Sequence, residues 1–233
     1  ILLDEKEALK KGIISPYLVP DAVYVDPLIT RSVPPEVTAA TGLDALTHCI
    51  EAYANKFAHP LIDVYALEGI RLISSSLAEA VRDGDNISAR SDMALGSLLG
   101  GLCLGPVNTA AIHALSYPLG SRFHIPHGLS NALLMPHVIS FNLPAAPERY
   151  AAIALAMGCR VRGSAMDTAL EGISLMEKIM ADCKVPRRLS EINIPRDAIA
   201  AMAQDALKIT RLLKNNPREL SMEDAVAIYE AAY

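Results

Sequence analysis

An acidic side chain and an imidazole stand one helical turn apart early in the sequence. Asp44 and His48 are four residues apart, and this spacing puts both side chains on one face of a helix. Leucines and isoleucines at three- and four-residue intervals mark the buried side of that helix, so the pair lies at its edge. The pair can supply two ligands to a metal ion, or it can form a surface hydrogen bond worth roughly a few tenths of a kcal/mol.

Half of the chain's six histidines fall in one short apolar stretch. His113, His124 and His127 lie within 15 positions, among prolines and glycines. Burying an imidazole with unsatisfied nitrogens is costly, and a divalent ion satisfies them. Imidazole suits Fe²⁺ and Zn²⁺, and a nearby carboxylate balances part of the charge. Residue types alone do not decide which histidine joins His113 as a ligand. Either His127 binds the ion, or His124 binds it and His127 forms a hydrogen bond to one of the ligand residues.

The elements that must position these side chains are helices. From Pro35 onward apolar residues recur at three- and four-residue spacing, and residues typical of helix caps, such as Ser221, precede several runs. The expected helices run from 35 to about 55, from 60 onward, from caps at 85–88 to about 104, and over 108–119, 128–141, 145–157, 164–183, 196–213 and 221–232. We therefore predict that residues 36–233 form one all-helical domain.

The first 35 residues follow a different pattern. Residues 22–27 are a short run of β-branched and aromatic side chains closed by a proline, which predicts a strand. Surrounding prolines exclude a long helix, and a strand without a partner is a poor unit by itself. We expect this region to be the tail of a sheet whose other strands lie outside this sequence.

A glycine cluster in the middle of the chain does not match a nucleotide-binding loop. Gly96, Gly100, Gly101 and Gly105 lack the GxGxxG spacing, and no strand precedes them. We interpret them as small residues that permit close packing of helices.

Composition excludes several classes of protein. The chain has 233 residues, a net charge of −5 and a pI near 5.7, which argues against a basic nucleic-acid-binding surface. No apolar run reaches membrane-spanning length. The four cysteines form no CxxC pair, so we expect reduced thiols in a cytoplasmic protein. We expect neither a nucleic-acid partner nor a membrane partner.

Three strings in the sequence resemble the iron-dependent, or type III, alcohol dehydrogenases. They are TGLDALTHCIEAY at 41–53, IHALSYPLG at 112–120 and IPHGLSNA at 125–132, with a weaker match, NNPR, at 215–218. In that family a nucleotide-binding α/β domain precedes an all-helical metal-binding domain of the dehydroquinate-synthase-like type. The resemblance implies a mainly α fold, with 36–233 as the helical catalytic domain. Residues 1–35 would be a short β-containing remnant, the tail end of the nucleotide-binding domain and its linker.

The resemblance also assigns the metal ligands. In the family they are one aspartate and three histidines, which by motif fall on Asp44, His48, His113 and His127. His124 would then lie near the cleft without binding the metal. His59 and His137 match no ligand position, and we interpret them as ordinary polar or capping residues.

Two departures from the family pattern bear on function. Tyr117 stands where many relatives carry a histidine that faces the substrate; a phenol can donate a hydrogen bond to a substrate oxygen but relays protons less readily near neutral pH. The family's glycine-rich pyrophosphate loop is missing, so NAD or NADP would be held by the preceding domain. Lys10 matches a lysine that reaches the cofactor in some relatives, and it can equally be a solvated surface lysine.

The resulting expectation is a metal-dependent, NAD(P)-linked alcohol dehydrogenase in which Fe²⁺ or Zn²⁺ acts as a Lewis acid on the substrate oxygen. Its expected partners are a small alcohol or aldehyde, its own N-terminal nucleotide-binding domain and a second copy in a homodimer. The helical part alone should bind metal without turning over substrate. The alternatives are a metal-dependent hydrolase, for which Glu51 is the nearest base by spacing, and a non-catalytic metal-binding helical module.

Overall fold

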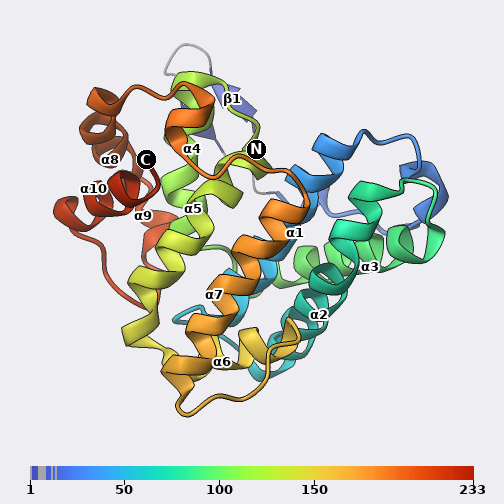
Figure 1. Ribbon diagram of the computed structural model, residues 1–233. Coiled ribbons are helices and arrows are strands. Elements are labelled where there is room, and N and C mark those ends of the chain that lie inside the picture. The colour runs from blue at the N-terminus through green and yellow to red at the C-terminus, as the bar shows by residue number, and fades with distance from the viewer. Residues whose placement is uncertain (1, 5–8, 12, 14) are drawn as a thin grey trace.

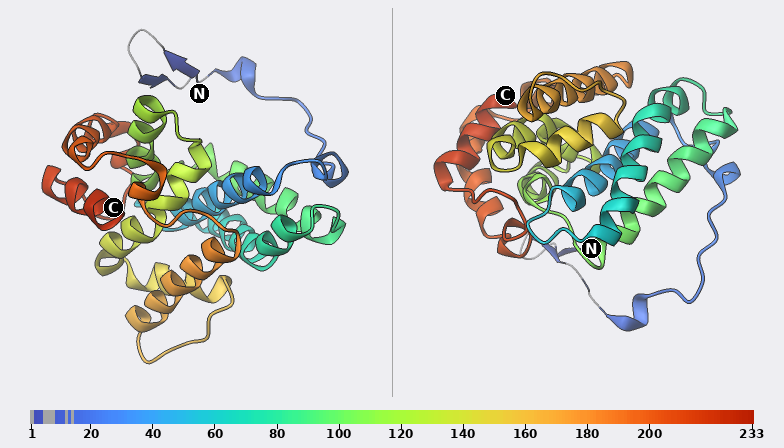
Figure 2. Two further views of the ribbon diagram at one scale, coloured as in Figure 1. Left: turned by 45° about the horizontal axis from the view of Figure 1, so that its top comes forward. Right: turned by 90° about the horizontal axis from the view of Figure 1, so that it is seen from below.

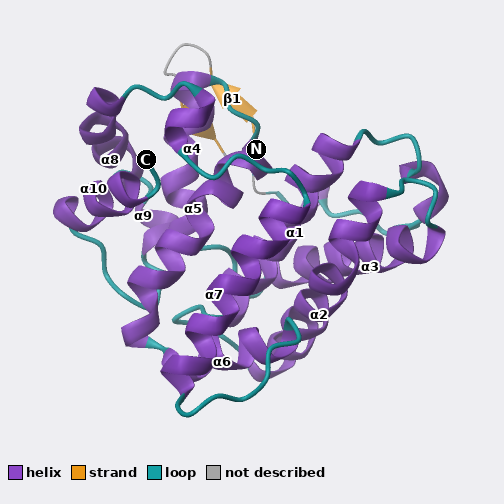
Figure 3. Cartoon of the chain, viewed as in Figure 1, coloured by secondary structure: helices purple, strands orange, loops and turns teal. Residues whose placement is uncertain are grey.

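Helices dominate the described structure, as the apolar spacing predicts (Figures 1 and 3). The computed structural model describes residues 2–4, 9–11, 13 and 15–233, with side chains for residue 13 and for 15–233. Within these residues the α-helices are α1 (Pro35–Tyr53), α2 (Pro60–Arg82), α3 (Ile87–Leu104), α4 (Ala111–Phe123), α5 (His127–Asn142), α6 (Pro147–Ala156), α7 (Ala165–Asp182), α8 (Ile199–Leu207), α9 (Thr210–Leu213) and α10 (Met222–Ala231). The fold is therefore mainly α. No described helix combines the length and the apolar composition that a membrane span requires.

Helix α1 packs against α2, α3 and α5, and the left view of Figure 2 shows it between the α2–α3 pair and α5. The apolar residues that predict α1 form its buried side: Leu43, Leu46 and Ile50 are each at most 1% exposed. Burial of each such side chain contributes about 1.5–3 kcal/mol. Because this face is fixed against its neighbours, the residues at its edge are held in place as well.

The remaining helices surround this centre. Helix α4 packs on α5 and α8, α10 packs on α5 and α8, and the α6–α7 pair contacts α2 and α5. Short 3₁₀ turns connect or precede the helices: η1 (Pro16–Leu18), η2 (Pro27–Thr30), η3 (Leu143–Ala145), η4 (Leu189–Ile192) and η5 (Arg196–Ala198).

Caps expected from the sequence begin several of these helices. The side chain of His59 accepts a hydrogen bond from the Leu61 amide at the start of α2, so His59 is a capping residue, as we interpret it. Asn86 caps α3 through the Ala89 amide, and Ser221 forms a capping box at the start of α10. These side chains satisfy amides that a helix leaves without partners.

Two helices differ from their predicted bounds. The helix expected over 196–213 is divided into η5, α8 and α9. Helices α8 and α9 are separate because Ile209 leaves the helical region with φ −83° and ψ 50°. The helix expected over 108–119 begins at Ala111 and continues to Phe123. Asn108 has a φ of 75°, which a right-handed helix does not accommodate.

The strand predicted over 22–27 is wrong. Residues 22–26 belong to no strand, and at Pro27 the chain enters η2, with Asp26 accepting a hydrogen bond from the Leu28 amide. The Tyr24 side chain is 93% exposed. A strand depends on hydrogen bonds to a neighbour, and no described strand pairs with this segment. Its β-type residues therefore remain extended and solvated.

The described strands lie earlier in the chain. β1 (Leu2–Asp4) and β2 (Leu9–Lys11) pair antiparallel, with Leu3 opposite Lys10. In the left view of Figure 2 this hairpin lies beyond the end of α4, joined to the bundle by a long connection. β2 contacts α4. The β content thus comes from a hairpin that the sequence pattern did not indicate.

The glycine cluster serves close packing at only two of its four positions. A Cβ at Gly96 would lie 2.6 Å from Cγ1 of Ile73, and one at Gly100 would lie 3.2 Å from the Ala45 carbonyl oxygen. Gly101 and Gly105 would meet nothing within 4 Å. The packing interpretation is therefore confirmed for Gly96 and Gly100 and wrong for the other two.

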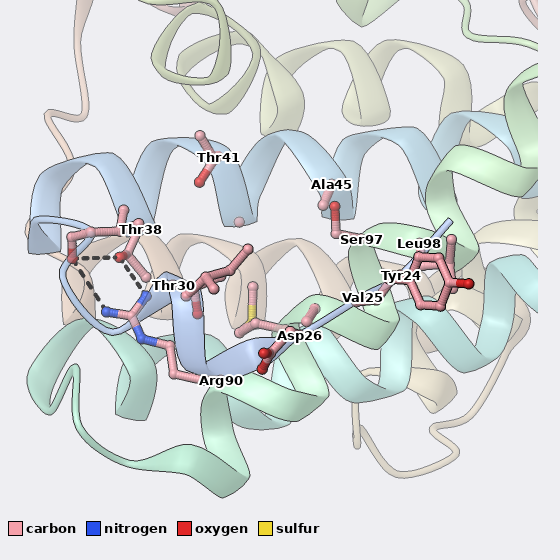
Figure 4. A pocket seen from close by; sticks show the side chains of 15 residues that line it. Tyr24, Val25, Asp26, Thr30, Thr38, Thr41, Ala45, Arg90, Ser97 and Leu98 are labelled. Carbon is pink, nitrogen blue, oxygen red and sulfur yellow. Dashed lines mark hydrogen bonds between the residues drawn. The ribbon is translucent and has the colours of Figure 1, made fainter. Parts of the chain in front are cut away.

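A buried arginine fastens the chain that precedes α1 to α3 (Figure 4). Arg90 is 4% exposed and donates hydrogen bonds to the Gly84 carbonyl at 3.0 Å, Thr38 Oγ1 at 2.8 Å and the Val33 carbonyl at 3.2 Å. A cavity of about 400 Å³ lies beside it, between α1, α3 and the 24–33 segment, and its lining includes none of the four predicted ligands.

Replacing Arg90 by Met should lower the free energy of unfolding by about 2–4 kcal/mol, because three acceptors lose a charged donor. Urea unfolding followed by circular dichroism measures the loss. Arg82→Met is the matched control, since Arg82 is exposed and should change stability by less than about 0.5 kcal/mol. Equal effects of the two substitutions would contradict this assignment.

Candidate metal centre

Three helices bring the four predicted ligands together. Asp44 and His48 lie one turn apart on α1, His113 is the third residue of α4, and His127 is the first residue of α5. Helix α5 packs against both α1 and α4. Residues far apart in sequence therefore share one small volume because their helices are fixed by the apolar core.

The ring nitrogens of three histidines lie near one oxygen, Asp44 Oδ1. Nε2 of His48 and Nε2 of His113 each lie 3.6 Å from it, and Nε2 of His127 lies 3.8 Å from it. The donor atoms of Asp44, His48 and His113 are all within 4.8 Å of one another. All three imidazoles thus turn the same ring nitrogen toward one carboxylate oxygen.

Gly128, which has no side chain, permits the close approach of α5 to α1. A Cβ at Gly128 would stand 2.1 Å from the Ala40 carbonyl oxygen and 3.2 Å from Cβ of Asp44. Atoms that are not bonded do not approach so closely, so any other residue would push α5 away from α1. Gly128 therefore lets His127 reach Asp44.

The cluster is buried at one end and open at the other. The His113 side chain is 4% exposed, whereas those of Asp44, His48 and His127 are 23%, 21% and 31% exposed. A small molecule can therefore approach from the side of the three open residues.

Burial and neighbouring charges shift the pKa values of the clustered side chains in different directions. Burial alone lowers the pKa of His113, but the Glu51 and Asp44 carboxylates outweigh it and raise that pKa to about 9. Burial and His113 together lower the pKa of His48 to about 4. Burial raises the pKa of the Asp44 carboxyl, but the three imidazoles outweigh this and hold it well below its usual range.

The donor set suits a divalent transition-metal ion. Three imidazole nitrogens and one carboxylate oxygen are typical ligands of Zn²⁺ and Fe²⁺. The separations of 3.6–3.8 Å between Asp44 Oδ1 and the ring nitrogens are too long for hydrogen bonds. Two ligand atoms on one tetrahedral ion are about 3.4 Å apart. The ring nitrogens of His48 and His113 are therefore spaced from Asp44 Oδ1 as ligands of a shared ion are, and Nε2 of His127 lies at a similar distance from that oxygen.

Asn131 is a part of this centre that residue patterns did not identify. It is fully buried, and its amide nitrogen lies 2.6 Å from Asp44 Oδ1, 3.2 Å from Nε2 of His113 and 3.3 Å from Nε2 of His127. Its Oδ1 has no hydrogen-bond partner among the described atoms. Asn131 lies four residues after His127, on the same helix face, and this spacing could have indicated that it belongs to the centre.

Glu51 lies behind His113 and is not a free base. Its carboxylate is 4% exposed, lies 2.6 Å from Nδ1 of His113, and accepts hydrogen bonds from the Ala110 and Ile112 amides. Both oxygens are engaged, on the side of the ring away from the cluster. The role that the hydrolase alternative gives to Glu51, a base activating water, is therefore wrong.

Tyr117 lies one helical turn beyond His113 on α4. Its ring centroid is 6.1 Å from that of His127, and the residue is 7% exposed. Burial raises the pKa of its phenol, an effect that Arg211 partly opposes. The hydroxyl is therefore protonated at neutral pH and able to donate a hydrogen bond.

The other histidines and Lys10 lie elsewhere. His124 is exposed and ends α4 with a φ of 56°. His137 is partly buried on α5 and lines a second cavity with Glu177. Lys10 belongs to β2, the strand that contacts α4; its side chain lies outside the described residues.

Comparison with known proteins identifies the class of protein. The C-terminal profile of the Fe-containing alcohol dehydrogenase family matches residues 38–233. Long-chain-alcohol dehydrogenase 1 of Geobacillus thermodenitrificans is 43% identical over 228 residues, which cover 97% of this chain and 58% of that protein. A crystal structure of 1,3-propanediol oxidoreductase superposes with a TM-score of 0.87 at 39% identity, covering 89% of this chain and 55% of that one.

A second similar structure contains a nicotinamide cofactor. Sulfoacetaldehyde reductase from Bifidobacterium kashiwanohense in complex with NAD⁺ has a TM-score of 0.79 and 28% identity, covering 89% of this chain and 53% of that one. The chain belongs to the Fe-containing alcohol dehydrogenase family and has the fold of its helical C-terminal domain. It spans between 53% and 58% of the length of these three relatives.

Replacing Gly128 by Ala should separate α5 from α1 and lower the free energy of unfolding by about 1–3 kcal/mol. Urea unfolding measures this. Gly101→Ala is the matched control: it adds the same methyl group to a helix in open space, and should raise stability by about 0.5–1 kcal/mol. A Gly128→Ala variant as stable as the wild type would show that the close approach is not required.

Proposed function

We propose that the protein is a metal-dependent, NAD(P)-linked alcohol dehydrogenase that interconverts a small alcohol with an aldehyde or ketone. The observation that carries the proposal is the convergence of three Nε2 atoms on Asp44 Oδ1 at 3.6–3.8 Å. Family membership and the names of the relatives support the reaction class. No feature of the described structure favours a second function.

In this proposal Asp44, His48, His113 and His127 hold one divalent ion, either Fe²⁺ or Zn²⁺. When bound, the ion supplies Lewis-acid polarisation of the substrate oxygen. The residues' own tasks are geometric and electrostatic. With the ion bound, the three histidines would each present a neutral nitrogen to it, Asp44 would balance part of the charge, and the open side of the cluster would admit the substrate.

Tyr117 is proposed as the residue that orients the substrate. Its buried phenol donates a hydrogen bond to an oxygen near the cluster and so fixes the position of the carbon that gains or loses hydride. Tyr117 packs in a small buried apolar cluster with Ala114 and Leu212, which limits the access of water to its ring. Tyr117 thus performs the orienting task, without the proton relay that a histidine at this position could provide.

The nicotinamide cofactor, NAD or NADP, supplies or accepts the hydride. We propose that a nucleotide-binding domain holds most of it, that residues 1–35 belong to that domain and its linker, and that 36–233 form the catalytic helical domain. The contact of β2 with α4 supports a role for Lys10 in cofactor binding, because it puts that strand beside the helix of His113 and Tyr117.

The remaining proposals concern partners and location. All four cysteines are free thiols, which supports a reducing, cytoplasmic location. We further propose that the protein forms a homodimer, acts on a small alcohol or aldehyde, and has neither a nucleic-acid partner nor a membrane partner.

Addition of Fe²⁺ or Zn²⁺ at about one hundred times its dissociation constant should stabilise the fold by about 2.7 kcal/mol, or roughly 5–10 °C in Tm. Differential scanning fluorimetry measures the shift, and a chelator should reverse it. His113→Ala should abolish the shift. His124→Asn is the control, since Asn tolerates the left-handed φ of that position; an equal loss in both variants would argue against this ligand set.

Tyr117→Phe should lower kcat/KM for alcohol oxidation by about 10- to 100-fold, because a hydrogen bond to the substrate oxygen is lost while the ring is kept. Formation of NADH or NADPH by the full-length protein with 1,2-propanediol or butanol provides the assay. Metal affinity should not change. Wild-type kinetics in the variant would remove Tyr117 from the proposed site.

A further inference from the structure

One buried carboxylate outside the proposed ligand set links two of the helices that form the metal centre. Glu51 lies on α1, and its three hydrogen-bonding neighbours lie at the start of α4. Its Oε2 accepts from the Ala110 amide at 2.9 Å and lies 2.6 Å from Nδ1 of His113, while its Oε1 accepts from the Ile112 amide at 2.5 Å. Glu51 is 5% exposed, so water does not replace these donors.

The backbone contacts explain how α4 begins. Ala110, the N-cap residue, offers no side-chain cap, and the first amides of a helix have no partners within it. Glu51 supplies the acceptor from a neighbouring helix, and its negative charge is favourable at a helix N-terminus. The carboxylate therefore sets where α4 starts, two residues before His113.

The contact with His113 determines how the imidazole is presented. A carboxylate only accepts hydrogen bonds, so Nδ1 of His113 carries the hydrogen in this contact. The other ring nitrogen, Nε2, then faces Asp44 Oδ1 at 3.6 Å. Because His113 is only 3% exposed, the surrounding core leaves the ring little freedom to turn away.

We propose that Glu51 is a positioning residue of the metal centre, which holds His113 by Nδ1 so that Nε2 points at the ion. The inference rests on the proposed function in that His113 is taken as a ligand. Carboxylates that hydrogen-bond a ligating histidine fix its ring orientation and increase its basicity, and their loss typically weakens metal binding by roughly 10- to 100-fold. Burying a carboxylate costs free energy unless donors surround it, and here three do.

Glu51→Gln tests this role with little change in shape. Gln has one acceptor oxygen, whereas the two carboxylate oxygens of Glu51 contact three donors. The amide NH₂ group of Gln must therefore face at least one of these donors. Zn²⁺ affinity of the full-length protein, measured by competition with a chromophoric chelator, should fall by roughly 10- to 100-fold. Long-range ¹H–¹⁵N spectra of the histidine rings in the Zn²⁺-loaded protein should show hydrogen on Nδ1 of His113 in the wild type, and a changed signal in the variant.

Asn215→Ala is the matched control. Asn215 is 5% exposed and donates to the Thr109 carbonyl at 2.8 Å, so it holds the same entry to α4 without touching His113. This variant should lose stability yet keep wild-type Zn²⁺ affinity and the wild-type His113 signal. If both variants weaken Zn²⁺ binding equally, Glu51 acts only through the helix start and the positioning role is overturned.

The remaining outcomes separate this inference from the proposed function. A wild type that binds Zn²⁺, with Glu51→Gln within twofold of it and the His113 signal unchanged, overturns the role of Glu51 alone. A wild type that binds no Zn²⁺ overturns the metal centre, and the role of Glu51 with it. Weakened binding in Glu51→Gln beside unchanged binding in Asn215→Ala supports the positioning role.

Discussion

The close approach of α5 to α1 is the constraint on which the centre depends. A Cβ at Gly128 would stand 2.1 Å from the Ala40 carbonyl oxygen, so two helix backbones are nearly in contact at the point where Asp44 and His127 face each other. Leu43, Leu46 and Ile50 hold the adjacent face of α1 in the core. The energy that fixes the site is therefore mainly apolar burial, and the polar side chains take positions that the packing sets.

Two buried polar residues add hydrogen bonds between the packed helices. Glu51 connects α1 to the first turn of α4, and Asn131 connects α5 to Asp44. Each helix that carries a candidate ligand is thus tied to another through a buried hydrogen bond beside the cluster. Such buried hydrogen bonds make the arrangement of side chains specific, which apolar packing alone does not do.

Helical periodicity predicted the helices, and the family strings selected the four candidate ligands that the structure brings together. Residues 36–233 carry clear three- and four-residue spacing, and caps such as Asn86 and Ser221 mark starts that the structure reproduces. Residue types left His124 and His127 equally eligible, and only the resemblance separated them. The structure brings His127 to 3.8 Å from Asp44 and leaves His124 exposed.

Other features depend on long-range contacts that no local pattern carries. The residues at 22–27 have strand composition, but without a neighbouring strand they remain extended. Spacing along α1 indicates Glu51 only as a base near the metal, whereas its contacts are with Ala110, Ile112 and His113, about sixty positions away in sequence. Gly101 belongs to a glycine cluster that reads as a packing motif, yet it faces open space. Which neighbour a residue meets is decided by the tertiary fold.

Anomalous X-ray diffraction from crystals grown with Zn²⁺, recorded at the zinc absorption edge, tests the central claim most directly. The account predicts one strong peak about 2.0–2.2 Å from Asp44 Oδ and from Nε2 of three histidines, His48, His113 and His127. A peak at another group of residues, or a density map in which one of these four side chains turns away from the ion, would contradict it.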